Sequence, residues 1–547
     1  MRFTSLLELS TDKICIHPLL RPNGLRFLLI VLLVLGVFFR FVNLDRKVYW
    51  FDEAYTSLRI SGYTEAELVQ QTVESQKMSS AALQKYQHPS PEKSVLDTIK
   101  GLAKEEPQHP PLYYVMVRYW AQWFGSCAAT MRSLSALFSL LVFPSVYWLC
   151  LELFPSSVTA WVAIALVAIS PVHVVYAQEA RQYSLWTVTI LLSSASLLRA
   201  MRLNTRQSWG MYTATLVLAL YTYLFSGLVA LGHGLYVVVM ERGRWTQRLR
   251  NYLLASVVSF LAFVPWILAV ATNLTSVQST TSWAAHQSTL FGTLKVWALN
   301  LRRMFFDLDF NFDNKFAYLI FVVFTYAFVL ILQGYAIYFL CRHTPKRVGL
   351  FILTLIGGTA LTLLLPDLIL GGRRSTTLRY IMPCLLGIQI AVAHFLATKI
   401  TAISKNTWSQ QLGRIIISVV VSLGVLSCAV GSQAETWWNK TISYYNPPVA
   451  RIINQSPQPL LISKASTTGP LSVGDVLSLS RLLAPKVTLQ LVVAPNIPKI
   501  NEGFSDVFLF TNSKSLRDKV GKQQNARVEP AYKQNHSTWL WKLAKKS

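Results

Sequence analysis

Two adjacent carboxylates stand a few residues after the first long apolar segment of the chain. Asp52 and Glu53 belong to the stretch YWFDEAYTSL, residues 49–58, together with Trp50 and Tyr55. A carboxylate at the low-dielectric edge of a membrane tends to have a raised pKa, which makes it a more capable general base. Carboxylates are also favoured at helix starts, where the helix dipole stabilises their charge. The stretch therefore indicates either a general base or a solvated charge pair that begins a helix.

Polar residues in two further motifs could contact a negatively charged substrate. In QHPPLYY, residues 108–114, the two prolines are typical of a helix start, and His109 could donate to a phosphate or be incidental. In SPVHVVYAQEARQYSL, residues 170–185, Glu179 and Arg181 lie at the junction of two apolar segments. Ionisable residues at such a depth are candidates for a functional site, with a structural Glu–Arg pair as the alternative.

Three arginines gather at the edge of a later apolar segment. Arg373, Arg374 and Arg379 occur in GGRRSTTLRY, residues 371–380. Neighbouring arginines can bind a phosphate through paired hydrogen bonds. The alternatives are contact with lipid headgroups or pairing with Asp367. We favour a bound lipid phosphate as the reason for these arginines.

Metal chemistry has little support in the sequence. Asp307 and Asp309 have the DxD spacing of a carboxylate pair for a divalent cation, and they are weak candidates for one. The 6 cysteines are scattered, without the CxxC spacing of a zinc site. The sequence therefore predicts no required cofactor and leaves the use of a divalent metal open.

The composition requires these residues to be positioned by membrane helices. Of the 547 residues, 52% are hydrophobic and 14% are charged, against roughly 25% charged in a soluble domain. The net charge of +26 fits basic cytoplasmic loops and contacts with anionic headgroups. No basic stripe with interleaved aromatic residues indicates nucleic-acid binding. We expect a polytopic α-helical membrane protein.

Apolar runs of the required length, about 18–20 residues, predict eleven transmembrane helices. Two of them come from the long stretch 209–240, which TYLFSGL divides near its middle. The other nine are residues 26–43, 133–151, 157–175, 182–198, 252–271, 316–341, 348–366, 379–398 and 414–431.

Basic residues orient these helices. If residues 111–125 form a juxtamembrane helix along the interface, four loops with three or four Lys/Arg each fall on the side of the N-terminal tail, 1–25. That tail is then cytoplasmic, and the first loop, 44–131, is extracytoplasmic. The same threading places Glu179 and Arg379 on the outer face, so the candidate residues share one side of the membrane.

The composition changes after about residue 432. Four short apolar segments there are typical of buried strands, and VGDVLSLSRLLAP is typical of a helix between them. We expect a small extracytoplasmic α/β domain over 432–547, with a structural or acceptor-related role, after a transmembrane domain over 26–431.

Four motifs in order resemble the C-type membrane glycosyltransferases. They are W-x-D-E-A, H-P-P-L-Y-Y, FG followed by R-S-L-S-A-L, and P-x-x-x-x-Y-x-Q-E-A-R-x-Y. The chain is most similar to the branch that holds protein O-mannosyltransferases and lipid A aminoarabinose transferases. The resemblance covers residues 25–240 well and is weaker in the later helices.

The resemblance implies a sugar donor carried on a polyprenyl phosphate, used outside the cytoplasm with inversion at the anomeric carbon. It implies that Asp52 is the catalytic base and that Glu53 supports it. His109 stands where the aminoarabinose transferases have a lysine on the lipid phosphate. The acceptor would be a protein, a lipid or an envelope glycan, and the location a bacterial inner membrane. Residues that would shape the donor and acceptor sites are Tyr55, Gln108, Arg132, Gln178, Glu179, Tyr183 and Tyr380.

Two other functions use the same residues differently. A flippase or transporter for polyprenyl-linked sugars would carry charges near the membrane midplane in repeated halves, whereas the charges here lie at the outer boundary. A non-catalytic subunit with this fold would not need the intact Asp52-Glu53 pair.

Overall fold

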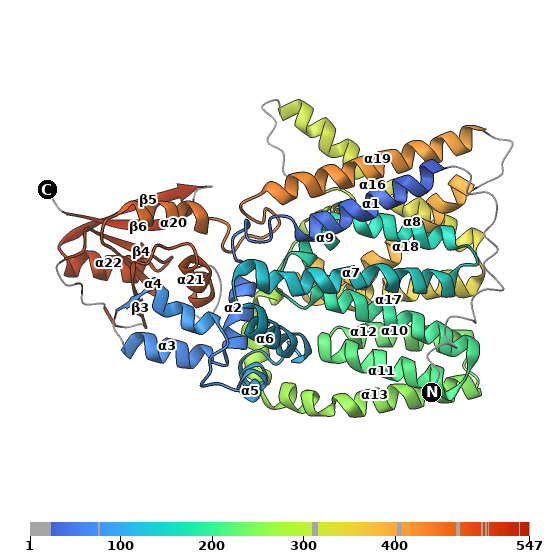
Figure 1. Cartoon of the computed structure of the whole chain (residues 1–547), viewed down its shortest axis with the longest axis horizontal. Coiled ribbons are helices and arrows are strands. Elements are labelled where there is room, and N and C mark those ends of the chain that lie inside the picture. The colour runs from blue at the N-terminus through green and yellow to red at the C-terminus, as the bar shows by residue number, and fades with distance from the viewer. Residues whose placement is uncertain are drawn as a thin grey trace.

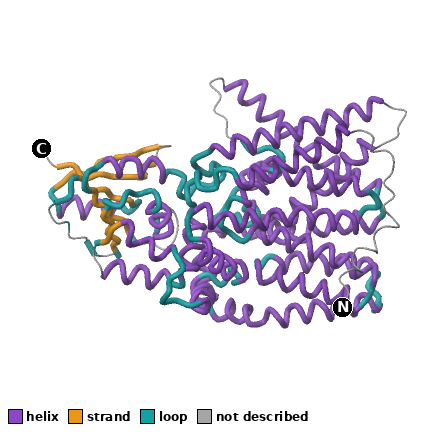
Figure 2. Tube along the Cα trace, in the orientation of Figure 1, coloured by secondary structure: helices purple, strands orange, loops and turns teal. Residues whose placement is uncertain are grey.

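A bundle of long helices lies beside a smaller unit that contains a sheet (Figure 1). The computed structural model describes residues 23–74, 77–308, 315–401, 407–465, 471–493, 496–497, 500, 503–534 and 537–545. The strands among these residues lie in the smaller unit, toward the C-terminal end of the chain (Figure 2).

The bundle is built from the apolar segments of the sequence. Its helices are α1 (Asn23–Phe41), α7 (Ala128–Leu153), α8 (Ser157–Ala168), α9 (Pro171–Ala177), α10 (Tyr183–Leu203), α11 (Arg206–Thr222), α12 (Ser226–Met240), α13 (Gln247–Thr272), α16 (Lys315–His343), α17 (Lys346–Leu370), α18 (Met382–Thr401) and α19 (Thr407–Gln433). Helix α10 packs on α7 and α11, and α18 packs on α8, α16 and α17. Helices α10 and α18 are the most enclosed, whereas α13, α16 and α19 expose most of their apolar surface, as helices in contact with lipid do.

Fewer helices than the predicted eleven meet the length and the apolar composition that a membrane crossing requires, within the described residues. Within the described ranges, 7 helices are long and apolar enough to cross a membrane, or 8 if the bent pair α8 and α9 forms one span. Helices α1 and α12 have shorter apolar stretches, Phe27–Phe41 and Ser226–Met240, and α11 has 17 residues. All the predicted segments are helical, but the count of eleven crossings is not confirmed.

The break between α8 and α9, where the axis bends by 61°, has a local cause. Pro171 takes the first position of α9, and the residue before a proline avoids the helical region. The buried Arg40 of α1 donates to the Ala168 carbonyl at the end of α8, at 2.7 Å. Gly36 permits this approach, because a Cβ there would lie 2.6 Å from the Ala168 Cβ. The bend brings the chain to residues 178–182 at the end of the bundle.

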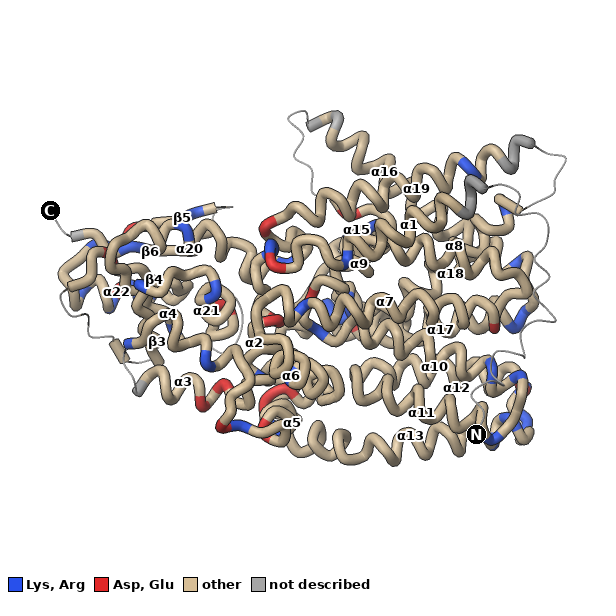
Figure 3. The backbone as a smooth tube through the Cα atoms, viewed as in Figure 1, with Lys and Arg blue, Asp and Glu red and all other residues tan. Residues whose placement is uncertain are grey.

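Charged residues are distributed unevenly along the bundle. Lys and Arg gather with few acids at the helix ends far from the sheet, whereas both signs of charge meet where the bundle joins the smaller unit (Figure 3). This asymmetry is the one that the positive-inside rule uses to orient a membrane protein.

The first loop forms a helical cap on the end of the bundle. Its elements are α2 (Phe51–Ser61), α3 (Glu65–Glu74), β1 (Met78–Ser79), α4 (Ser80–Leu83), the 3-10 helix η3 (Gln84–Gln87), α5 (Val95–Glu105) and α6 (Leu112–Phe124). Helix α6 corresponds to the predicted juxtamembrane helix; it packs on α2, α5 and α7 and ends before Gly125, whose φ is +90°. Four shorter elements contact one another or the bundle helices: α14 (Leu274–Thr281), η4 (Ser282–Ala285), α15 (Leu290–Arg303) and η5 (Leu378–Ile381).

Arg118 of α6 links the parts of this cap. Its side chain is buried, and its guanidinium donates to the carbonyls of Ile60, Ser90 and Lys93. We expect Arg118→Met to lower the free energy of unfolding by about 3 kcal/mol, because buried carbonyls lose their donor. Thermal unfolding in detergent micelles measures the change. Arg451→Gln, which breaks the exposed pair of Arg451 with Glu435, should change the midpoint little; equal shifts would contradict the linking role.

The smaller unit is a mixed sheet with helices on it. The sheet has 6 strands in the order β1-β3-β2-β4-β6-β5, with β2 parallel to β3 and β4, and the other pairs antiparallel. The C-terminal elements are α20 (Asn446–Gln455), β2 (Pro459–Lys464), α21 (Val473–Ser480), β3 (Thr488–Val492), β4 (Asp506–Phe510), α22 (Lys514–Gln523), β5 (Ala526–Gln534) and β6 (Ser537–Lys545). The edge strand β1 comes from the first loop, so this loop and the C-terminal segment share one sheet.

The C-terminal unit also packs directly on α2. Helix α21 lies against α2, and Gly474 permits the contact, because a Cβ there would lie 2.3 Å from the ring of Tyr55 and 2.8 Å from that of Phe51. The helix that carries the two carboxylates is thus held between the bundle and the C-terminal unit.

Candidate active site

The two carboxylates lie in the first turn of α2, as the helix-start interpretation requires. Trp50 is the N-cap residue, and its backbone N–H donates to Oε2 of Glu53 at 2.9 Å. Gly62 ends the helix with a φ of +89°, which a glycine adopts without strain. The side chains of Asp52 and Glu53 lie in different environments, one partly exposed and the other buried.

Glu53 is completely buried and fully bonded. The Arg132 guanidinium donates to both of its oxygens, at 2.8 Å and 2.7 Å, and the Ala180 backbone N–H donates to Oε1 at 2.9 Å. Burial raises the pKa of Glu53, but the charge and hydrogen bonds of Arg132 outweigh it, and the pKa is lowered overall. A carboxylate held in this way anchors the first turn of α2, directly beside Asp52.

Arg132 extends this anchor to the chain before α2. Its two terminal nitrogens donate to the carbonyls of Leu44, at 2.7 Å, and Val48, at 2.9 Å. One buried side chain on α7 therefore fixes both the loop that follows α1 and the first turn of α2.

Unlike the buried Glu53, Asp52 lies at a partly open surface. Its side chain is 15% exposed, and its Oδ2 lies 3.4 Å from Nη1 of Arg379, which is 19% exposed. Arg181 donates to the Asp52 backbone carbonyl at 3.2 Å. The two arginines come from the ends of separate bundle segments, so the fold brings together three residues that are far apart in sequence.

Aromatic rings surround the Arg379 guanidinium. Its Cζ lies 5.5–5.9 Å from four ring centroids, a distance at which cation–π attraction operates. The four rings belong to Trp50, Tyr183, Trp283 and Tyr380. They fix the position of Arg379 while leaving it partly open beside Asp52.

His109 supports Arg181. The Arg181 guanidinium lies 3.0 Å from Nε2 of His109, and the side-chain amide of Gln182 lies 3.0 Å from Nδ1. Burial, followed by the Arg181 charge, holds the pKa of His109 well below its usual range. In the neutral ring, Nε2 accepts a hydrogen bond from the Arg181 guanidinium, so the ring proton is on Nδ1. This N–H can donate to the side-chain oxygen of Gln182 when the Gln182 amide is rotated to present that oxygen. Both ring nitrogens are thus engaged by protein, and His109 orients Arg181.

Several buried polar atoms at this end of the bundle have no hydrogen-bond partner in the described part of the chain. They include four donors, Nε1 of Trp50, Oη of Tyr114, Oη of Tyr183 and Nε of Arg181, and two acceptors, Oε1 of Gln108 and Oε1 of Glu179. Unpaired buried groups of this kind are costly and indicate a site for a polar ligand. The four donors suit the oxygens of a phosphate.

Four other predicted site residues are engaged elsewhere. Tyr55 donates to Glu65 on α3, at 3.0 Å. Gln178 donates to the carbonyls at the end of α1 and accepts from Lys47. Arg374 pairs with the buried Asp367 at 3.2 Å, the alternative considered for it, and Arg373 donates to the Trp283 carbonyl from an exposed position. Of the three arginines in this motif, Arg379 alone is paired with Asp52 in the described structure.

Sequence reasoning missed residues that complete the site. Trp283 and Tyr223 pack on Tyr380, and Lys440 pairs with Glu179. Lys440 follows two tryptophans directly after the last apolar segment, and a cation beside interfacial aromatics on the outer side was the available signal.

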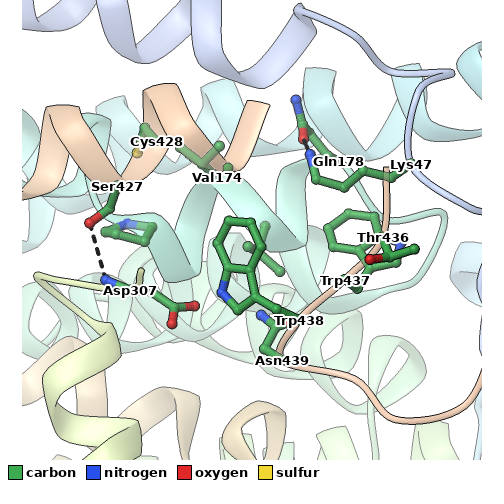
Figure 4. Close-up of a pocket in the computed structure, with 13 residues that line it drawn as sticks. Lys47, Val174, Gln178, Asp307, Ser427, Cys428, Thr436, Trp437, Trp438 and Asn439 are labelled. Atoms are coloured by element: carbon green, nitrogen blue, oxygen red, sulfur yellow. Dashed lines mark hydrogen bonds between the residues drawn. The ribbon is translucent and has the colours of Figure 1, made fainter. Parts of the chain in front are cut away.

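The weak metal candidates do not form a ligand cluster. Asp307 lines a cavity of about 20 Å³ beside α9 and α19, with room for about one water molecule (Figure 4). Its carboxylate lies 3.4 Å from Nε of Arg303. Asp309 lies outside the described residues. Among the residues that are described, no group of three or more His, Cys, Asp or Glu side chains could hold a metal ion.

A cluster of carboxylates borders the site on the first loop. Arg59 of α2 pairs with Glu105 and with Glu106, the latter at 2.7 Å, and Glu105 accepts from the backbone of Glu65. Burial, with the charges of the other two glutamates, raises the pKa of Glu65 to about 8 against the attraction of Arg59.

This pKa predicts a pH dependence of stability. Between pH 4.5 and about 8 the folded protein binds one proton more than the unfolded chain at Glu65, so stability falls as the pH rises through this window. The slope is at most about 1.4 kcal/mol per pH unit. Glu65→Gln should flatten the dependence of the unfolding midpoint between pH 5 and pH 8. Parallel curves for the two proteins would contradict it.

Comparisons with known proteins show which family and which fold the chain resembles. Residues 108–268 match the family model of the dolichyl-phosphate-mannose-protein mannosyltransferases. The crystal structure of ArnT from Cupriavidus metallidurans in the apo state matches with a TM-score of 0.52 and 14% sequence identity, over 95% of this chain and 98% of that one. The same protein bound to undecaprenyl phosphate matches with a TM-score of 0.54 and 14% identity, over 95% of this chain and 97% of that one. No protein with a curated description matches the sequence significantly.

At this identity the structural matches show the fold. The family match contains His109, Arg132, Glu179 and Arg181, whereas Asp52 and Arg379 lie outside it. Both comparisons confirm the resemblance found in the sequence, and the chain has the fold of the C-type membrane glycosyltransferases.

Proposed function

We propose that the protein is an inverting glycosyltransferase that moves a sugar from a polyprenyl-phosphate donor to an acceptor at the outer membrane surface. The observation that carries the proposal is the partly open Asp52 carboxylate beside Arg379 and Arg181, at the edge of the helix bundle. Two further findings support it. The matched ArnT structure holds undecaprenyl phosphate, and the family match names a lipid-phosphate sugar donor.

The geometry suggests how the residues act. The acceptor oxygen attacks the anomeric carbon from the face opposite the phosphate, while Asp52 takes the proton of the attacking hydroxyl. The bond between the anomeric carbon and the phosphate oxygen breaks, and the electron pair leaves with the phosphate. Arg379, Arg181 and the hydroxyl of Tyr183 stabilise the negative charge that develops there. In this proposal arginines supply the positive charge, and no cofactor is required.

We propose that the candidate active site lies on the extracytoplasmic side of the membrane. The first loop and the C-terminal unit would lie outside and the opposite helix ends in the cytoplasm, an orientation that the charge asymmetry of the bundle supports. We propose a bacterial inner membrane as the location, and a protein, lipid or envelope glycan as the acceptor.

Transfer can be separated from transport in liposomes. The purified protein is reconstituted with undecaprenyl phosphates that carry radiolabelled mannose, glucose or aminoarabinose, together with a crude envelope extract as acceptor. The expected result is release of bare undecaprenyl phosphate with label in the acceptor, for at least one of the sugars. Passage of intact sugar lipid between leaflets without release would instead support a flippase, and neither activity would support a non-catalytic subunit.

A further inference from the structure

A segment from the C-terminal part of the chain reaches the candidate active site. We call residues 434–445, which follow α19, the C-terminal strap. The Val48 backbone N–H donates to the Glu435 carbonyl at 2.8 Å, and Nε1 of Trp437 donates to the Val48 carbonyl at 3.0 Å. Trp437 is buried against Val48 and Trp50. The strap is therefore joined to the residues that directly precede Asp52.

Lys440 projects from this strap into an aromatic enclosure. Its Nζ lies 3.7 Å from the ring centroid of Trp50 and 4.6 Å from that of Trp437. It forms an ion pair with Oε2 of Glu179, whose side chain is completely buried. An ammonium between two tryptophan rings and a carboxylate is held firmly in place.

Glu179 keeps one oxygen without a partner. Its Oε1 is buried and has no hydrogen bond within the described part of the chain. The neighbouring residues already serve the site, since Ala180 donates to Glu53 and Arg181 donates to the Asp52 carbonyl. A buried carboxylate oxygen without a donor is unfavourable, and a hydroxyl group of a ligand would satisfy it.

Electrostatic interactions connect Glu179 with the other two carboxylates. Burial and the charges of Glu53 and Asp52 raise the pKa of Glu179 above its usual value, against the opposing effect of the Lys440 ammonium. These contributions show that the three carboxylates lie within electrostatic reach of one another. Glu179 is thus an acceptor within electrostatic reach of Asp52, and its partner Lys440 lies over the Trp50 ring that also flanks Arg379.

We propose that Glu179, held in place by Lys440, accepts a hydrogen bond from a hydroxyl of the donor sugar and helps to select that sugar. This inference rests on the proposed function and adds a specificity residue to it. Lys440 is a positioning residue, because it acts through Glu179. A hydroxyl bonded to a carboxylate also explains why an acidic residue stands in a site that binds a phosphate.

The test compares a sugar-carrying lipid with the bare lipid phosphate. Binding of undecaprenyl phosphate, and of undecaprenyl phosphates with mannose, glucose or aminoarabinose, is measured on the full-length protein in nanodiscs. The variant is Glu179→Leu with Lys440→Met, which removes both charges and leaves neither one buried and unpaired. We expect the wild-type protein to prefer at least one sugar lipid, and the variant to lose about 10–100-fold of that affinity. Affinity for the bare lipid should stay the same.

A matched control lies on the same part of the chain. Glu435 of the strap pairs with Arg451 of α20, and both side chains are more than half exposed. Replacing both by glutamine should alter neither affinity. If the double variant of Glu179 and Lys440 does not fold, Glu179→Met with Lys440→Leu, which likewise removes the acceptor and leaves no unpaired charge, gives the same comparison.

Two results would overturn the inference. A variant that keeps the wild-type ratio of affinities would show that Glu179 contacts no sugar hydroxyl. If the wild-type protein binds undecaprenyl phosphate but prefers none of the sugar lipids, Glu179 likewise contacts no sugar hydroxyl. Failure of the wild-type protein to bind even undecaprenyl phosphate would contradict the proposed function itself.

Discussion

The Asp52→Asn variant is expected to transfer sugar about 10²–10⁴ times more slowly than the wild-type protein, with little change in its affinity for undecaprenyl phosphate. Asparagine has nearly the same shape as aspartate, and its side-chain oxygen can still face Arg379. It cannot take a proton from the acceptor. Because the loss falls on a step that occurs only in the transition state, kcat should fall while KM for the donor changes little.

This expectation is checked by initial rates of label transfer at saturating donor. Asp45 provides the control, since it lies seven residues upstream on the same loop, at an exposed position. Asp45→Asn should keep the wild-type rate. An Asp52→Asn protein that turns over at more than about half the wild-type rate would remove Asp52 as the base and leave the two arginines without a catalytic partner.

The helices of the bundle and four of the strands after residue 432 could be predicted because hydrophobic periodicity is a local property, whereas β5, α20 and α22 lie outside the predicted segments. Each apolar run became a helix, and β2, β3, β4 and β6 lie in the four segments with the pattern of buried strands. The strand β1 could not be predicted, because two residues, Met78 and Ser79, carry no periodic signal. Their pairing with β3 depends on where the fold brings the first loop.

The sequence also could not divide roles between neighbouring residues of the same type. Asp52 and Glu53 differ by one methylene group, and the burial of Glu53 depends on its ion pair with Arg132, about eighty residues away, whereas Asp52 stays partly open. The same holds for Arg374 and Arg379. Arg374 pairs with Asp367, whereas Arg379, which lies in η5, pairs with Asp52.

Lys440 illustrates a further limit. Its partners are Glu179 and two tryptophans, one before α2 and one on its own strap. No spacing in the sequence connects these positions, because the contact depends on α19 returning the chain to the same end of the bundle as α2. Burial of a charge in that place becomes evident only from the folded structure.

The largest effect on stability should come from Arg132. We expect Arg132→Met to lower the free energy of unfolding by about 3–5 kcal/mol, because Glu53 would be left as a buried charge without a partner. The carbonyls of Leu44 and Val48 would lose their donor as well. Thermal or denaturant unfolding in detergent micelles measures the change, with Arg451→Gln as the control for an exposed pair.

A second substitution distinguishes an unpaired charge from a simple loss of packing. The double variant Arg132→Met with Glu53→Leu should recover part of the stability lost by Arg132→Met, because it removes the uncompensated carboxylate. Transfer activity should not recover, since the first turn of α2 loses the bonds from Arg132 and Ala180 that orient Asp52. If stability and activity recover together, Glu53 does not position the base. If neither the single nor the double variant is destabilised, the buried pair contributes no anchor to the fold.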